Sequence, residues 1–381
     1  MTGFLANEDL TPNAIELARQ RRAAAGGYID LTSSNPTHQG LLFPAEILHA
    51  AADQYWQHRH YTPDARGAAP ARAAIAGYYA RRTPALPITP ADILITASTS
   101  EAYSLLFTLL TDPGDNLLAP AVTYPLFEYL AAMHRIELRP YALDERRDWR
   151  IDPASLRAQA DARTRGVLVV SPHNPTGMVV QAPVPALDSL ALPVICDEVF
   201  AEFPYRISHV PPLGALHPQL PIFHLNGISK MFALPDLKLG WIALSAAART
   251  QYGERLELLN DTFLSAGALP QAMLPAIIEH GGAFVGMMRD RVYSSITLAC
   301  EVLRACPALS VTEPDGGYYL FPEIHGWDDE EALVLYLLEQ GVLVHPGFFF
   351  NYELGTRIMI SCLTEPAQLR AGCERIVAAL S

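Results

Sequence analysis

The chain has two lysines, Lys230 and Lys238, and both lie in the segment NGISKMFALPDLKLG (residues 226–240). Its other permanently charged basic side chains are twenty-five arginines. Lys230 follows the apolar run PIFHLNG, where a strand is expected to give way to a turn. A lysine amine can lose its proton and form an imine with an aldehyde, which an arginine cannot do. Because this chain uses arginine almost everywhere else, we interpret Lys230 as a Schiff-base lysine rather than a surface charge.

Three more polar or aromatic residues come at or after the ends of apolar runs. Asp197 closes PVICD, and a carboxylate at the end of a buried strand needs a partner such as a protonated heterocyclic nitrogen. A helix cap or an ion pair would explain Asp197 equally well. Asn174 in the turn SPHNPTG can donate to a ligand oxygen, and Tyr124 in APAVTYPLFEY can stack on a flat ring. An ordinary turn and a packed core tyrosine are the simpler explanations when each is taken alone.

Two candidate anion sites accompany these residues. Ser98, Thr99 and Ser100 stand at the expected start of the helix TSEAYSLLFTLL, where hydroxyls, free N–H groups and the helix dipole can hold a phosphate. Simple helix capping has the same signature. Arg357 in GTRIMISC is expected to point away from the core and to bind a carboxylate through two parallel hydrogen bonds, although most arginines are surface charges.

The elements that position these residues follow a repeating pattern from about residue 92. Short apolar runs alternate with turns and helix-like stretches: DILITAS, NLLAP, RIELRPYAL, GVLVVSP, PVICDEVF, PIFHLNG and KLGWIAL. This alternation predicts an α/β fold whose large domain, residues 45–285, has a mostly parallel sheet flanked by helices. Ligands bind at the carboxyl ends of strands in such sheets. Residues 1–44 and 286–381 are expected to form a smaller α+β domain from both chain ends.

The overall composition argues against several classes of function. A net charge of −13 with scattered arginines argues against a nucleic-acid or anionic-membrane partner. No apolar segment approaches the roughly 20 residues that span a bilayer, and the first residues lack a targeting pattern, so a cytoplasmic location is expected. The five cysteines form no CxxC pair, which predicts neither a disulfide framework nor a metal site. Small-molecule chemistry is therefore favoured.

The order and spacing of these segments resemble the pyridoxal-phosphate-dependent aminotransferases of class I/II, in the fold type I or aspartate aminotransferase superfamily. The resemblance runs over nearly the whole chain through LTSSNPT, YTPDARG, ITASTSEA, TYPLFEY, SPHNPTG, CDEVF, SKMFALPDLKLGW, DGGYYLF and TRIMIS. It implies the cofactor pyridoxal 5'-phosphate, an amino acid and a 2-oxo acid as substrates, and an active homodimer.

The resemblance also implies a role for each candidate residue. Lys230 would form the Schiff base and shuttle a proton, and Asp197 would keep the pyridine nitrogen protonated. Asn174 would donate to the phenolic oxygen of the cofactor, and Tyr124 would stack on its ring. The remaining implied contacts are to the phosphate, from Ser98, Thr99, Ser100, Lys238 and the neighbouring subunit's copy of Tyr61, and to the substrate, from Arg357, Ser34 and Asn35.

Three positions depart from the commonest motif of this family. Phe200 stands where a tyrosine usually donates to the phenolic oxygen, which predicts a Schiff base that keeps its proton to higher pH. Gly227 replaces a serine of the phosphate site. Lys238 replaces an arginine, so the charge is kept but the bidentate fork is lost. These departures weaken any inference about the preferred substrate.

Amino-group transfer between an α-amino acid and a 2-oxo acid is the leading hypothesis. β-Elimination, γ-replacement or an oxidase-like reaction would use the same lysine, aspartate and arginine, so another pyridoxal-phosphate-dependent chemistry remains the alternative. A cofactor-binding sensor module is disfavoured, because those proteins carry a basic DNA-binding domain for which we expect no room before LTSSNPT. Arg66 and Arg206 are candidates for a second carboxylate contact, and the substrate side chain stays open.

Overall fold

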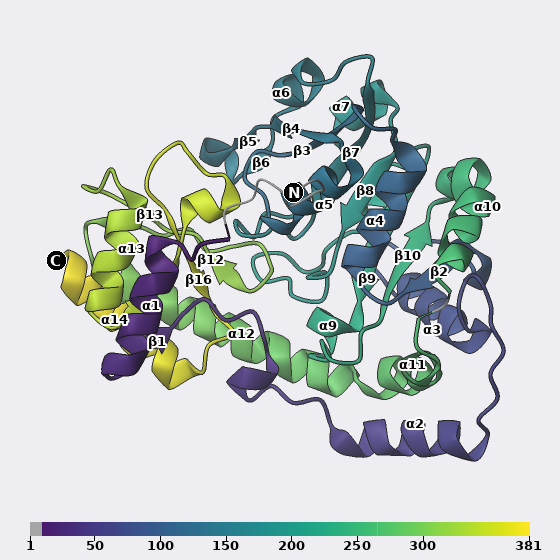
Figure 1. The fold of residues 1–381 in the computed structure, drawn as a ribbon, viewed down its shortest axis with the longest axis horizontal. Coiled ribbons are helices and arrows are strands. Elements are labelled where there is room, and N and C mark those ends of the chain that lie inside the picture. The colour runs from purple at the N-terminus through teal and green to yellow at the C-terminus, as the bar shows by residue number, and fades with distance from the viewer. Residues whose placement is uncertain (1–9, 265) are drawn as a thin grey trace.

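A seven-stranded sheet forms the middle of the molecule (Figure 1). The computed structural model describes residues 10–264 and 266–381. The sheet has the order β2-β10-β9-β8-β7-β3-β4, and its strands β3, β4, β7, β8 and β9 are mutually parallel, whereas β10 runs antiparallel to β2 and β9. The strands are β2 (Ile93–Thr96), β3 (Asn116–Pro120), β4 (Glu137–Tyr141), β7 (Thr164–Val170), β8 (Val194–Asp197), β9 (Ile222–Gly227) and β10 (Gly240–Leu244). The predicted mostly parallel α/β sheet is confirmed.

Helices cover both faces of this sheet, which explains why its strands read as continuous apolar runs. In β7, Val167 and Val169 enter one core cluster, while Leu168 and Val170 enter another. The cluster with Leu168 includes side chains of α4 (Thr99–Leu110), α5 (Leu126–His134) and α10 (Ala246–Thr262). The other cluster includes side chains of α3 (Ala69–Ala80), α6 (Pro153–Ala158), α7 (Pro185–Leu190), α8 (Leu213–Leu216) and α11 (Ala268–His280). Helix α2 (Ala45–Gln57) packs against α11.

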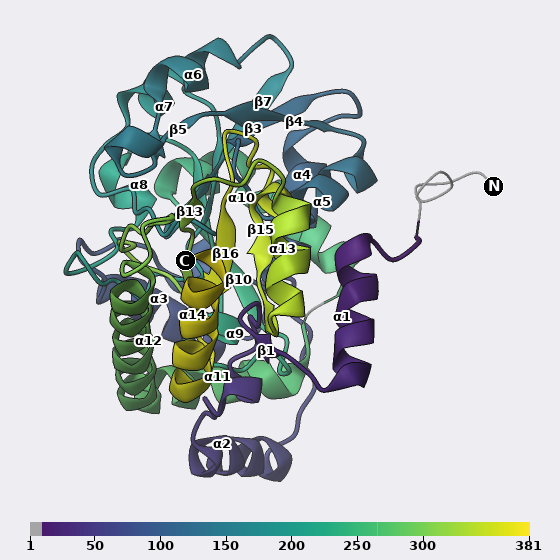
Figure 2. The same cartoon turned by 90° about the vertical axis from the view of Figure 1, so that its left-hand side faces the viewer.

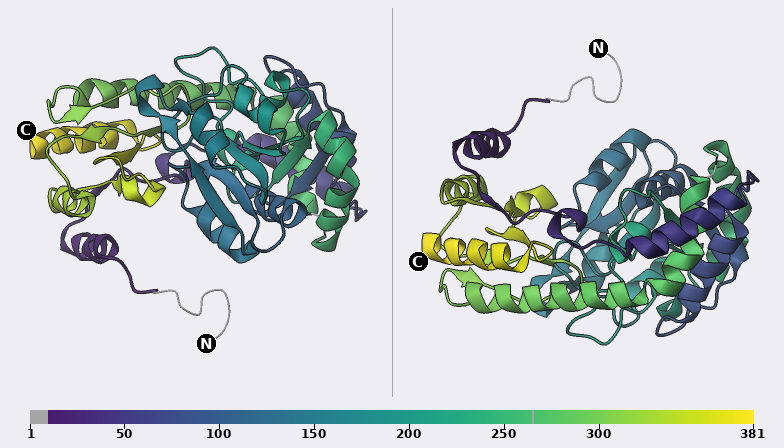
Figure 3. Two further views of the ribbon diagram at one scale, coloured as in Figure 1. Left: turned by 90° about the horizontal axis from the view of Figure 1, so that it is seen from above. Right: turned by 90° about the horizontal axis from the view of Figure 1, so that it is seen from below.

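Elements from the two ends of the chain lie side by side, as Figures 2 and 3 show. Strand β1 (Ile29–Asp30) pairs in parallel with β14 (Val342–Leu343), and α1 (Ala14–Ala25) packs against α13 (Glu330–Glu339). A three-stranded sheet, β12 (Tyr319–Leu320), β16 (Ile358–Ser361) and β15 (His345–Pro346), lies beside them, with α14 (Pro366–Leu380) closing the chain. This arrangement fits a smaller unit from both ends, whose bounds stay a prediction.

The expected boundary at residue 285 does not coincide with the end of an element. Helix α12 (Gly282–Leu303) runs without a break across the expected boundary at 285. The segment 311–323 contributes only the short β12 and the first residue of β13 (Glu323–Ile324) to strands, because Gly316 and Gly317 bend the chain before Tyr318.

Short elements complete the described chain. They are β5 (Leu143–Asp144), β6 (Arg150–Ile151), β11 (Leu309–Ser310), α9 (Ile228–Met231) and the 3-10 turns Thr37–Gln39, Pro90–Asp92, Glu145–Arg147 and Gly347–Phe350. Within the described ranges, no helix combines the length and apolar character needed to cross a membrane.

Candidate active site

A cavity of about 310 Å³ lies beside the carboxyl ends of the parallel strands. Nine of the residues selected from the sequence line it: Ser34, Ser98, Thr99, Ser100, Tyr124, Asn174, Asp197, Lys230 and Lys238. Most of them come together because they follow parallel strands whose carboxyl ends share one edge of the sheet, whereas Ser34 follows β1 and Lys238 precedes the antiparallel β10. Asp197 is the last residue of β8, and Lys230 stands one helical turn beyond the end of β9.

Asp197 is held in one orientation by two hydrogen bonds. The Tyr103 hydroxyl donates to Oδ2 at 2.8 Å, and the Val199 N–H donates to Oδ1 at 3.1 Å. Burial raises the pKa of Asp197 to about 6, so its charge is costly without a cationic partner. A cationic partner would therefore stabilise this carboxylate. Tyr103 lies on α4 one turn after Ser100. The sequence did not identify it as a site residue, because it only continues the apolar face of that helix.

Lys230 is fixed at both its amine and its backbone. Its Nζ donates to the carbonyl of Ser34 at 3.3 Å, and the Tyr318 hydroxyl donates to the Lys230 carbonyl at 2.7 Å. Burial lowers the pKa of the Lys230 amine, while the negative charge of Asp197 opposes this shift. The amine is thus easier to deprotonate than an ordinary lysine, which suits it to nucleophilic and base chemistry.

The N-terminus of α4 forms the anion-binding end of the cavity. Ser98 is the N-cap, and its Oγ accepts from the N–H of Glu101 at 3.1 Å. Thr99 and Ser100, in the first turn, present N–H groups that have no partner within the helix. Lys238 lines the same cavity and has φ of 50°, a left-handed conformation that a side chain adopts only at some cost. A phosphate there would meet both hydroxyls and a cation.

Gly227 is a steric requirement of this end of the site. It pairs with Gly240 in the β9-β10 ladder, and a Cβ at position 227 would lie 2.8 Å from the carbonyl oxygen of Leu239. A Cβ on Gly240 would lie 3.0 Å from the N atom of Thr99. The two glycines let β9, β10 and α4 approach closely. The serine that the family commonly has at position 227 would not fit this backbone.

Asn174 has an unsatisfied amide. Its Oδ1 is buried without a hydrogen-bond partner among the described residues. The preceding residue, His173, is engaged on both ring nitrogens, by Thr176 Oγ1 at 2.9 Å and by the Val122 carbonyl at 3.0 Å. Asn174 is therefore held on a fixed turn with a polar group that a ligand can complete.

Arg357 does not line this cavity, contrary to its selection as a substrate contact. Its guanidinium is buried rather than pointing away from the core, and its Nη2 lies 2.7 Å from Glu145 and 3.4 Å from Glu323. The ring of Trp149 stacks on it, with 4.9 Å between Cζ and the ring centroid. We predicted that this guanidinium would bind the substrate carboxylate, but in the structure it pairs with Glu145 and Glu323.

Four other predicted residues also stand apart from the cavity lining. Asn35 accepts from the N–H and hydroxyl of Thr37 at 3.0 and 2.8 Å, which explains it as a turn residue. Tyr61 is 68% exposed beside α2, a position open to a neighbouring subunit. Arg66 and Arg206 pair with Glu257 and Asp315.

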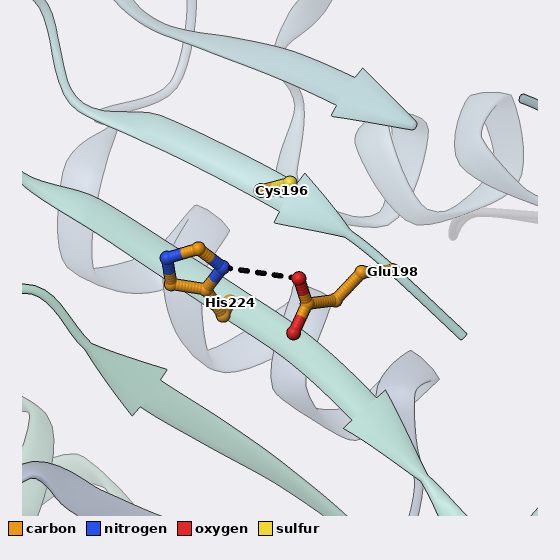
Figure 4. Close-up of side chains that lie close together, drawn as sticks. All are labelled: Cys196, Glu198 and His224. Carbon is orange, nitrogen blue, oxygen red and sulfur yellow. Dashed lines mark hydrogen bonds and ion pairs between the residues drawn. The ribbon is translucent and has the colours of Figure 1, made fainter. Parts of the chain in front are cut away.

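Cys196, Glu198 and His224 gather next to Asp197 in a buried cluster (Figure 4). Their ligand atoms lie within 4.8 Å of one another, but His224 and Glu198 already have partners within the protein. His224 Nε2 accepts from the Gly214 N–H at 3.3 Å, which leaves its Nδ1 proton for Glu198 at 3.3 Å. Arg82 pairs with the other oxygen of Glu198 at 3.3 Å. The cluster is an ion-pair network that supports the end of β8 rather than a metal centre.

Comparisons with known proteins identify the family of this chain. The family described as aminotransferase class I and II matches residues 27–376. The glutamate-pyruvate aminotransferase of Escherichia coli is 27% identical over 90% of this chain and 88% of its own length. The tyrosine aminotransferase of Homo sapiens is 28% identical over 91% and 80%. The solved structure of an alanine aminotransferase from Pyrococcus furiosus superposes with a TM-score of 0.89 at 24% identity, covering 99% of this chain and 98% of that one.

The chain belongs to the class I and II aminotransferases. It is an enzyme of amino-group transfer with the fold type I architecture of pyridoxal-phosphate-dependent enzymes.

Proposed function

We propose that this chain transfers an amino group between an α-amino acid and a 2-oxo acid, with pyridoxal 5'-phosphate attached at Lys230. The observation that carries the proposal is the meeting of Lys230 and Asp197 in one cavity. An amine with a lowered pKa and a buried carboxylate with a raised pKa are brought there by neighbouring parallel strands. Strongly perturbed pKa values in a cleft are typical of functional groups.

The residues of the cavity fit this cofactor. Asn174 has a buried amide oxygen without a partner among described residues, and a 180° rotation of the amide would present its N–H₂ group at that place instead. Asp197 offers a carboxylate whose burial favours a cationic partner. Ser98, Thr99 and Ser100 offer hydroxyl and N–H donors to a phosphate. A ring that carries an aldehyde, a basic nitrogen, a phenolic oxygen and a phosphate matches this donor set.

Pyridoxal phosphate, when bound, supplies an aldehyde for the lysine amine and a ring that withdraws electrons from the substrate Cα. Asp197 would hold a proton on the ring nitrogen, and its two hydrogen bonds to Tyr103 and Val199 fix the direction in which it does so. Tyr124, 44% exposed in the cavity, would cover one face of the ring.

Lys230 would move the proton of the substrate Cα. Its side chain reaches the carbonyl of Ser34, so the amine lies at the border between the sheet edge and the chain-end elements. The lowered pKa leaves a larger neutral fraction of the amine at neutral pH than an exposed lysine has. A neutral amine is the form that accepts a proton.

Two further features belong to this proposal. The exposed position of Tyr61 supports a homodimer in which that tyrosine reaches the neighbouring phosphate site. We propose a cytoplasmic enzyme with small-molecule substrates and without a nucleic-acid or membrane partner, in keeping with its net charge of −13.

The test is a half-reaction screen on the cofactor-loaded enzyme. Glutamate, alanine, tyrosine and aspartate are added singly, the cofactor absorbance is followed, and 2-oxo acids are then added. Amino-group transfer predicts a spectral change that a 2-oxo acid reverses. Release of ammonia and a 2-oxo acid without such reversal would instead support β-elimination. Unchanged spectra with every amino acid would refute both.

A further inference from the structure

The cavity around Lys230 is built from two parts of the fold. All its lining residues lie between positions 98 and 239 except Ser34 and Tyr319. The groups proposed to hold the cofactor belong to the first part. Tyr319 belongs to β12 in the three-stranded sheet of the chain-end elements. Its side chain thus meets the cavity from a different layer of structure, on the side left for the substrate.

Tyr319 is a cavity-lining tyrosine whose hydroxyl is uncommitted. The Tyr103 hydroxyl donates to Asp197, and the Tyr318 hydroxyl donates to the Lys230 carbonyl. Tyr319 is 6% exposed, and its hydroxyl makes no hydrogen bond to any residue in the ranges 10–264 and 266–381. The hydroxyl oxygen is accessible from the cavity, so a ligand there can accept its hydrogen bond.

The ring of Tyr319 is held firmly. It packs edge-on against Phe200, with 5.9 Å between ring centroids and an interplanar angle of 86°. Burial raises the pKa of Tyr319 above its ordinary value, so the hydroxyl stays protonated at neutral pH and acts as a donor. A fixed, protonated hydroxyl at the cavity wall suits the binding of an anionic group.

No arginine lines this cavity within the described part of the chain. Its two cations, Lys230 and Lys238, are assigned to the cofactor aldehyde and phosphate. Arg357 is retained by Glu145 and Glu323. The carboxylate of an amino acid substrate must therefore meet a neutral donor from this chain.

We propose that the Tyr319 hydroxyl binds the carboxylate of the amino acid substrate, an inference that rests on the proposed amino-group transfer. Loss of a hydrogen bond to a charged group weakens binding by roughly tenfold to a hundredfold. Because a hydroxyl carries no charge, primary amines without a carboxylate lose less affinity here than at a site with an arginine clamp.

The experiment compares the cofactor-loaded wild type with Tyr319→Phe, and with Tyr129→Phe as a control that removes an exposed hydroxyl outside the cavity. The probes are 2-methylalanine, α-methylglutamate and α-methyltyrosine, which lack the Cα proton and so report binding alone. The dissociation constant of each probe is read from the cofactor absorbance, and that of the cofactor from equilibrium dialysis.

We expect Tyr319→Phe to weaken the probe that wild type binds best by about tenfold or more, with cofactor affinity within about twofold of wild type and the control unchanged. Unchanged probe binding in Tyr319→Phe would overturn the inference, as would a loss confined to cofactor affinity. A wild type that fails the half-reaction screen would refute the proposed function itself, so the two failures are distinguishable.

Discussion

The guanidinium of Arg357 and the carboxylate of Glu145 lie 2.7 Å apart, although 212 residues separate them in the sequence. Arg357 belongs to the chain-end segment before β16, and Glu145 belongs to the turn after β5. The aromatic rings of Trp149, Phe321 and Tyr352 surround the same guanidinium at 4.9 to 5.7 Å. This contact ties the chain-end elements to the rest of the molecule and withdraws the arginine from the cavity.

Replacement of Arg357 is therefore expected to affect stability and not substrate binding. Arg357→Ala should lower the free energy of unfolding by about 1–3 kcal/mol, less than a fully buried pair because Glu145 and Glu323 remain 27% and 40% exposed. Denaturant unfolding measures the loss, and Arg370→Ala, at an exposed pair of 3.8 Å, should change little. A large rise in KM with unchanged stability would instead indicate that Arg357 binds the substrate carboxylate.

Replacing the buried carboxylate of Asp197 by a neutral group is expected to raise the stability of the fold by an amount that depends on pH. Its pKa is about 6 in the folded chain against 3.8 for an unperturbed group, so the folded state binds more protons between these values and stability falls as pH rises through them. The cofactor-free Asp197→Asn variant should match wild type near pH 4 and exceed it by about 3 kcal/mol above pH 6. Urea unfolding at pH 4 and pH 7.5 tests this, and an equal difference at both would contradict it.

Restoring the serine that the family commonly has at position 227 should damage the site. The Cβ of Gly227→Ser would lie 2.8 Å from the Leu239 carbonyl, so β9 or β10 must shift beside the α4 N-terminus. We expect weaker cofactor binding and a stability loss of about 1–3 kcal/mol. The matched control is Gly286→Ser, where a Cβ meets nothing within 4 Å. Tighter cofactor binding by Gly227→Ser would show that the backbone accommodates the side chain.

Phe200 stands where the family commonly has a tyrosine, so adding the hydroxyl there tests its effect on the bound cofactor. It is 3% exposed, lines the cavity and packs against Tyr318 with 4.8 Å between ring centroids. Phe200→Tyr should add a donor that favours a negative phenolic oxygen, so the pH midpoint of the bound cofactor's absorbance change should move downward. A spectrophotometric titration of both proteins measures it. An upward shift would mean that the added hydroxyl points elsewhere.

Sequence reasoning found the groups whose positions follow from the fold class alone. Once a parallel sheet is predicted, Asp197 at one strand end and Lys230 after another must face the same edge, and both line the cavity. Arg357 could not be placed in this way, because Glu145 and Trp149 reach it only through tertiary packing. Tyr319 was missed because the segment DGGYYLF shows a bend but not which tyrosine enters the cavity.

The most direct test of the central claim is the site of covalent cofactor attachment. The cofactor-loaded enzyme is reduced with borohydride, digested and mapped by mass spectrometry, which is simple in a chain with only two lysines. We expect the cofactor on Lys230 alone, and Lys230→Arg should keep the fold but lose both the label and the half-reaction. Label on Lys238, or none on either lysine in an enzyme that binds the cofactor, would contradict it.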